Sequence, residues 1–102
     1  MVPTLNSIFE AVSLASGIPV AAIRGRRKTQ AVAYARFVIV YLVRQAFPWW
    51  SLAELAAAIG RSDHGTALHA LGRARALQHR DRTFAELLAR AQAGLQAKRI
   101  AD

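Results

Sequence analysis

The stretch that decides the fold is SLAELAAAIGRSDHGTALHALGRARAL, residues 51–77. Ser51 and Glu54 have the capping-box spacing, in which each side chain accepts a backbone N–H at a helix start. Gly60 then supplies a turn, and a second helix is predicted from Ser62 or Asp63 to about residue 77. The apolar positions of this second helix share one face: Ala67, Ala70, Leu71, Ala74 and Leu77. The stretch therefore predicts a helix-turn-helix.

Helical spacing also precedes this stretch. Leu5, Ile8, Phe9 and Val12 recur at the i, i+3, i+4, i+7 spacing of a helix that buries one face. Gly17 suits the left-handed residue that ends such a helix, and Pro19 suits the first turn of a short helix that continues to Ile23. Residues 31–47 are apolar nearly all round, which predicts a central helix packed by several neighbours.

Helical spacing continues after the stretch as well. Thr83 and Glu86 repeat the capping-box spacing, so we predict a last helix at about residues 83–100. Its apolar face consists of Phe84, Leu87, Leu88, Ala91 and Leu95. No segment alternates apolar and polar residues as a strand does. We therefore predict an all-α fold, a compact bundle of five to six helices in which residues 1–102 form a single domain.

Charge is the first indication of function. The chain carries 14 Lys and Arg against 6 Asp and Glu, a formal net charge of +8. Four of the cations, Arg24, Arg26, Arg27 and Lys28, fall within the seven residues RGRRKTQ before the central helix. A basic domain of this size most often binds a polyanion, of which nucleic acid is the commonest.

Several other classes are disfavoured. The chain has no Cys for a disulfide or thiolate metal site, and its longest apolar run, residues 37–43, is too short to span a membrane. No basic leader precedes an apolar stretch, so we expect no signal peptide and a cytoplasmic protein. Adjacent Ser62, Asp63 and His64 diverge instead of forming a triad, and the chain lacks a Gly-rich loop ending in Gly-Lys-Ser/Thr. We expect no enzyme, cofactor, metal or bound ATP.

The second helix of a helix-turn-helix enters the major groove of DNA with its N-terminus first. At that end, Asp63 is able to accept a hydrogen bond from a cytosine amino group, and His64 and Thr66 are able to donate to bases or phosphates. The alternative is that Ser62 or Asp63 only caps the helix, since both residue types are favoured there. The residues alone leave both interpretations open.

The segment GRSDHGTALHA, residues 60–70, resembles the signature GGRDHTTVLHA of the C-terminal DNA-binding domain, domain IV, of the bacterial replication initiator DnaA. The short helix, basic loop, Arg36 in the central helix and Ser51-Leu52 follow in the same order. The resemblance covers about residues 5–77, and it implies a DnaA domain IV-like (TrpR-like) fold with an extra C-terminal helix. Because the chain starts with Met and carries a full set of helices, we expect a stand-alone relative.

The resemblance also implies a function: sequence-specific binding of double-stranded DNA at sites similar to the DnaA box. The role would be in replication initiation or its regulation, or in transcription control, on the nucleoid. The implied base-reading residues are Asp63, His64 and Gly65 in the major groove and Lys28 in the minor groove. The implied contacts to the DNA backbone are Arg26, Arg27, Arg36, Arg44, Arg61, Ser62, Thr66 and His69.

Three positions depart from the family pattern. Gly65 stands where the family has Thr, Ser62 where it usually has Arg, and Phe37 where it has a polar residue facing phosphate. We therefore expect a preferred site different from the usual DnaA box, because one good base contact contributes about 1–3 kcal/mol of discrimination. Six cations on phosphates would give a log–log salt slope of roughly −5.

A helical interaction module is the alternative from another functional class. In that interpretation the basic loop binds an acidic partner protein, and the last helix is a docking surface. The same helix, about residues 83–100, is a candidate surface for self-association.

Overall fold

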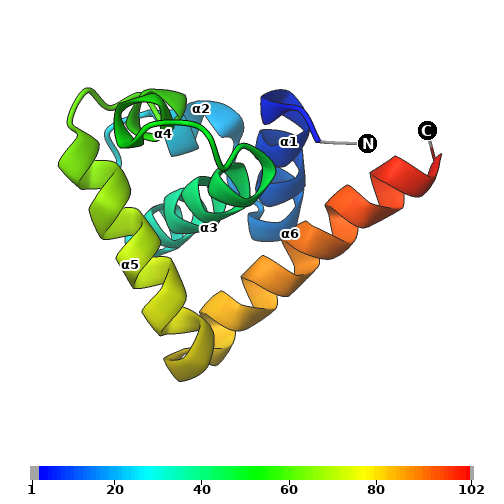
Figure 1. The fold of residues 1–102 in the computed structure, drawn as a ribbon. Helices are drawn as coiled ribbons and strands as arrows, with labels where there is room; N and C mark the ends of the chain where they lie inside the picture. The colour runs from blue at the N-terminus through cyan, green and yellow to red at the C-terminus, as the bar shows by residue number, and fades with distance from the viewer. Residues whose placement is uncertain (1–2, 102) are drawn as a thin grey trace.

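A long apolar helix, α3 (Gln30–Ala46), runs through the centre of the molecule, and the other helices surround it (Figure 1). The computed structural model describes the backbone of residues 3–101 and the side chains of residues 3–97. This part of the chain contains helices but no strand, so the predicted all-α fold is confirmed. The other helices are α1 (Leu5–Ser16), α2 (Val20–Arg24), α4 (Leu52–Ala58), α5 (His64–Arg80) and α6 (Arg82–Ala101).

The helices in the first half of the chain begin and end close to the residues that the sequence indicates. Gly17 follows α1 in the left-handed conformation, with φ of 74°. Pro19 stands just before α2 as its N-cap rather than inside its first turn. Thr29 caps α3 by accepting a hydrogen bond from the backbone N–H of Val32 at 3.3 Å. The helix then continues to Ala46, two residues before Pro48.

The helix-turn-helix consists of α4, a turn and α5. The predicted capping box is present, because Ser51 Oγ accepts from the N–H of Glu54 and the Glu54 carboxylate accepts from the N–H of Ser51. Gly60 takes φ of 74° in the turn, where a Cβ atom would also lie 3.1 Å from the carbonyl oxygen of Arg24. Residue 60 is therefore glycine for two reasons, its backbone conformation and its close approach to the end of α2.

The start of α6 differs from the expectation. The capping box predicted at Thr83 and Glu86 is wrong, since α6 already begins at Arg82. Asp81 occupies the single residue between α5 and α6, and its Oδ1 accepts from the N–H of Phe84 at 3.1 Å. Its Oδ2 accepts from the hydroxyl of Tyr34 on α3 at 2.5 Å. The cap is therefore local, and a second bond from a residue 47 positions away ties it to the central helix.

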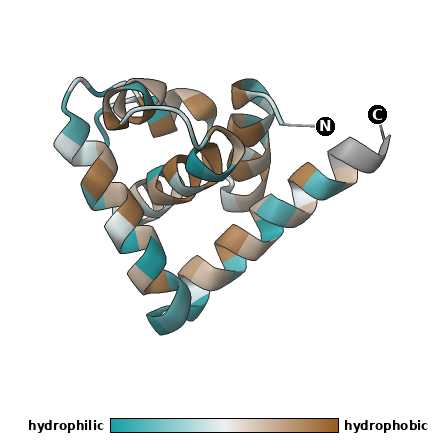
Figure 2. Ribbon diagram, in the orientation of Figure 1, coloured by the Kyte–Doolittle hydropathy of each residue, from teal (hydrophilic) through white to brown (hydrophobic). Residues whose placement is uncertain are grey.

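The core lies where α3 meets its neighbours, and Figure 2 shows hydrophobic residues concentrated on α3 and on the helices around it. Fully buried side chains come from every helix, including Phe9 of α1, Ile23 of α2, Leu55 of α4 and Phe84 of α6. The radius of gyration, 12.5 Å, matches the value of about 13 Å typical of a single domain of this length. Among the described residues, no helix combines the length and the apolarity needed to cross a membrane.

Candidate nucleic-acid interface

The start of α5 is exposed. Asp63 is the N-cap, and its Oδ1 accepts a hydrogen bond from the N–H of Gly65 at 2.8 Å. Ser62, Asp63, His64 and Gly65 are all exposed, and Thr66 is half-buried. The turn before α5 and the first turn of α5 appear as a hydrophilic corner of the molecule in Figure 2. Asp63 therefore caps the helix while its other carboxylate oxygen stays at the surface.

Gly65 gives the Asp63 carboxylate its space. A Cβ atom at residue 65 would lie 3.2 Å from Asp63 Oδ1, closer than most side-chain contacts in proteins. The carboxylate would have to move by a few tenths of an ångström to admit a larger residue. Compared with the Thr of the family pattern, Gly65 changes the exposed start of α5 in two ways. It removes a side chain, and it lets the Asp63 carboxylate lie close to the first turn of the helix.

The next turn of α5 adds two exposed side chains. His69 lies edge-on against Phe37 of α3, with ring centroids 5.9 Å apart. Leu68 is 59% exposed. No motif in the sequence marks Leu68. The sequence does place Leu68 four residues after His64 and outside the buried face of α5. Because residues four apart share a helix face, this spacing indicates that Leu68 lies beside His64.

The basic loop, residues 25–29, lies beside the turn that leads into α5. Arg26, Arg27 and Lys28 are all exposed. One end of the loop is tied to the turn, since Nη2 of Arg61 donates to the carbonyl oxygen of Gly25 at 2.9 Å. The sequence did not show this contact, which brings the exposed cations and the start of α5 to neighbouring parts of the surface.

Arg36 has a different role from the one expected. We expected a contact to the DNA backbone, but its side chain is only 9% exposed. Its Nε, Nη1 and Nη2 donate to the carbonyl oxygens of Ile23, Arg27 and Gly25 at 2.7, 2.7 and 2.6 Å. Burial lowers the pKa of Arg36 from its usual value, and the nearby charge of Arg61 lowers it further. The three donors of Arg36 are thus used inside the protein, where they hold the backbone of the loop.

Arg44 also donates to backbone carbonyls. Its Nη1 lies 3.0 Å from the carbonyl oxygen of Pro48 and 3.0 Å from that of Trp50. These bonds stabilise the connection between α3 and α4, where Phe47 stacks on Trp50 with ring centroids 4.7 Å apart. Because Arg44 is half-buried, any phosphate contact would add to this structural role.

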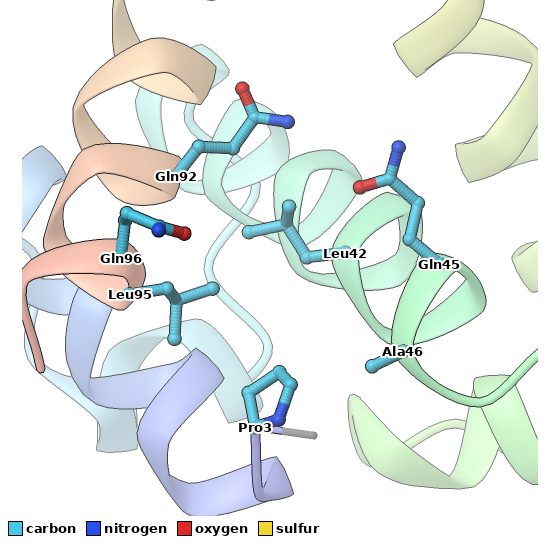
Figure 3. A pocket seen from close by; sticks show the side chains of 7 residues that line it. All are labelled: Pro3, Leu42, Gln45, Ala46, Gln92, Leu95 and Gln96. Atoms are coloured by element: carbon cyan, nitrogen blue, oxygen red, sulfur yellow. The ribbon is translucent and has the colours of Figure 1, made fainter. Parts of the chain in front are cut away.

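The described residues contain no cluster of metal-binding side chains. No three His, Cys, Asp or Glu side chains in this part of the chain lie close enough to hold a metal ion. A pocket of about 310 Å³ between α3 and α6 is lined only by uncharged residues. Leu42 and Leu95 point toward each other across it, and its polar groups are glutamine amides (Figure 3). None of its lining residues comes from the basic loop or from α5.

Comparison with known proteins agrees with the helix-turn-helix formed by α4, the turn and α5. A family model described as "Bacterial dnaA protein helix-turn-helix" matches residues 5–73, which include α1 to α4 and the first part of α5. The chromosomal replication initiator protein DnaA of Herpetosiphon aurantiacus is 39% identical over 66 residues. That match covers 65% of this chain and only 14% of the initiator.

Proposed function

The chain belongs to the family of bacterial DnaA helix-turn-helix domains, and we propose that it binds double-stranded DNA with sequence preference. The start of α5 enters the major groove, and the basic loop reaches the adjacent minor groove. The observation that carries the proposal is the bond between Arg61 and the Gly25 carbonyl oxygen. It joins two exposed segments that have the residue types DNA recognition requires.

Asp63, His64 and Gly65 read bases in this proposal. The second carboxylate oxygen of Asp63 accepts from a cytosine amino group, while the first continues to cap the helix. His64 is exposed at the first helical position and donates to a base acceptor. Gly65 exposes the helix backbone, so bases approach it more closely than they approach the Thr of the family pattern. Leu68 lies one turn further along the same face and offers an apolar surface to a thymine methyl group.

The basic loop and the flanks of α5 supply the minor-groove and phosphate contacts. Lys28 enters the minor groove, and Arg26 and Arg27 contact phosphates beside it. The other proposed phosphate contacts are Arg44, Arg61, Ser62, Thr66 and His69. Arg36 is omitted because its donors are used inside the protein. Four cations on phosphates, Arg26, Arg27, Arg44 and Arg61, would give a log–log salt slope of about −3.6, and Lys28 in the minor groove would bring it to about −4.5.

The biological role we propose follows from the matched relative, which is a replication initiator. Binding at sites similar to the DnaA box would place the protein on the nucleoid, in replication initiation, its regulation or transcription control. The chain spans a small share of the initiator's length. The initiator's other activities therefore do not enter the proposal.

Selection of bound duplexes from a randomised pool tests this function. The wild-type protein should enrich one sequence pattern, and His64→Ala should flatten the preference at the bases in the major groove while largely sparing non-specific affinity. His79→Ala is the matched control, because His79 is an exposed histidine of α5 about 22 Å further along the helix axis. It should leave the preference unchanged.

Two results would contradict the proposal. The first is an unchanged selection profile for His64→Ala, which would remove the base-reading role of the tip. The second is equal affinity for duplex DNA of any sequence and for polyglutamate at the same salt concentration. That result would favour the helical interaction module with an acidic partner.

A further inference from the structure

The carbonyl oxygen of Gly25 accepts hydrogen bonds from two arginines. Nη2 of Arg36 lies 2.6 Å away and Nη2 of Arg61 lies 2.9 Å away. Arg36 belongs to the central helix, whereas Arg61 belongs to the turn before α5. One backbone atom at the start of the basic loop is therefore fixed both to the core and to the helix-turn-helix.

Arg36 holds the loop at more than this one point. Its other two donors bind the carbonyl oxygens of Ile23, before the loop, and Arg27, within it. The three nitrogen atoms of a guanidinium group lie in one plane at fixed angles, so they hold three carbonyls in one geometry. A lysine ammonium is a single nitrogen on a flexible stem and cannot reproduce this arrangement.

The contacts extend to the backbone of the turn itself. Gly60 approaches so closely that a Cβ atom there would lie 3.1 Å from the carbonyl oxygen of Arg24. Arg24 in turn places its guanidinium carbon 4.3 Å from the centre of the Phe9 ring. The end of α2, the basic loop and the turn before α5 thus form one connected unit.

We propose that Arg36 and Arg61 are positioning residues, which hold the basic loop at a fixed separation from the start of α5. Lys28 then meets the minor groove, and Arg26 and Arg27 meet the phosphates beside it, in register with the bases that the start of α5 reads. This inference rests on the proposed DNA-binding function and adds a specificity role for residues that touch no base. A loop ordered before binding also loses less conformational entropy when DNA binds.

A direct phosphate contact by Arg36 is the competing explanation. It would require a 9% exposed side chain to leave three carbonyl oxygens at 2.6–2.7 Å. The two explanations differ in whether lysine can replace arginine at position 36. Lysine binds phosphate well as a point charge, so a phosphate contact would survive Arg36→Lys, whereas the positioning role would not.

The first experiment measures order in the loop of the free protein. Trypsin cleaves after Arg26, Arg27 and Lys28, and mass spectrometry identifies the sites. At a temperature where each variant is fully folded, Arg36→Lys and Arg36→Met should be cut in the loop about tenfold faster than the wild type. Arg44→Met is the matched control, because Arg44 also lies on α3 and also donates to carbonyls, but away from the loop. It should leave loop cleavage unchanged.

Arg61→Met is the second variant. It removes one donor to Gly25 and leaves Arg36 in place, so we expect it to disturb folding less than Arg36→Met does. Its loop should be cut faster than that of the wild type, by a smaller factor than in the Arg36 variants. Loop cleavage at the wild-type rate in Arg36→Lys and Arg61→Met would overturn the positioning role.

The second experiment is duplex selection with Arg36→Lys. Preference should fall about tenfold at the base pairs on the minor-groove side of the site and remain at the base pairs that depend on His64. Equal loss at all positions would indicate a merely structural role, and wild-type preference would indicate a phosphate contact. If the wild-type protein binds no duplex, the proposed function fails, while the cleavage rates still decide whether Arg36 and Arg61 order the loop.

Discussion

Two aspartates cap helices in this molecule, and their surroundings differ. Asp63 at the start of α5 is exposed and accepts from the N–H of Gly65. Asp81 at the start of α6 is half-buried and accepts from both the N–H of Phe84 and the hydroxyl of Tyr34. The same residue type therefore anchors a helix to the core at one end of α5 and remains accessible to a ligand at the other. An aspartate is able to cap a helix and also to contact a ligand where the cap uses only one of its carboxylate oxygens.

Asp81→Ala should have the largest effect on stability. It removes the cap of α6 and leaves the buried Tyr34 hydroxyl without its acceptor, so the Tm should fall by roughly 10 °C. Asp63→Ala loses only an exposed cap, and its Tm should fall by less than half as much. Thermal unfolding measures both. Equal losses for the two variants would remove the distinction between the caps.

Gly65→Thr should change DNA preference more than it changes stability. The new Cβ atom would lie 3.2 Å from Asp63 Oδ1, so the exposed carboxylate shifts, and a methyl and a hydroxyl group enter the base-reading surface. We expect a change of about 1–3 kcal/mol in discrimination at one base pair. Competition between duplexes that differ at single positions measures it. An unchanged preference at every position would show that residue 65 faces no base.

The link between Tyr34 and Asp81 should make stability depend on pH at both extremes. The hydrogen bond from Tyr34, followed by that from the N–H of Phe84, lowers the pKa of Asp81. The contribution of Asp81 is therefore present above the usual aspartate range and is lost as the pH falls through the lowered pKa. The same bond, and then burial, raises the pKa of Tyr34. Its contribution is present below pH 10 and is lost as the pH rises through the raised pKa.

Tyr34→Phe distinguishes the pH dependence due to the Tyr34–Asp81 hydrogen bond from that due to the other titrating groups. Its ring should keep the edge-on contact with Phe84, whose centroid lies 5.3 Å away. Without the hydroxyl, the acid loss of stability should move to higher pH and the alkaline loss should become smaller. Urea unfolding across the pH range measures both limbs. Identical curves for wild type and variant would show that the bond carries no pH dependence.

Gly72→Ala should give the smallest effect and serves as the control for Gly65→Thr. Gly72 is an exposed residue of α5, and a Cβ atom there would meet nothing within 4 Å. Replacing glycine inside a helix should raise the free energy of unfolding by roughly 0.5–1 kcal/mol. DNA preference should not change. A loss of stability would indicate a constraint on this turn of α5 that the structure does not show.

The sequence predicted features that depend on neighbouring residues and missed those that depend on distant ones. The Ser51–Glu54 capping box, the left-handed Gly17 and the exposed tip around His64 follow from local patterns. The Thr83–Glu86 box failed because Asp81, two residues earlier, accepts from the N–H of Phe84 and caps α6 there, and the distant Tyr34 adds a second bond to the same carboxylate. The inward position of the Arg36 side chain could not be predicted, because it depends on distant residues. Its carbonyl partners lie 9 to 13 residues away, in backbone positions that no sequence pattern marks.

Backbone amide shifts during titration with a selected duplex test the central claim most directly. We expect the largest changes in two groups, residues 26–29 of the basic loop and residues 62–69 at the start of α5. The amides around Asp81 should change little. Large changes confined to α1 and α6, with both groups unchanged, would show that DNA does not meet the basic loop and the start of α5.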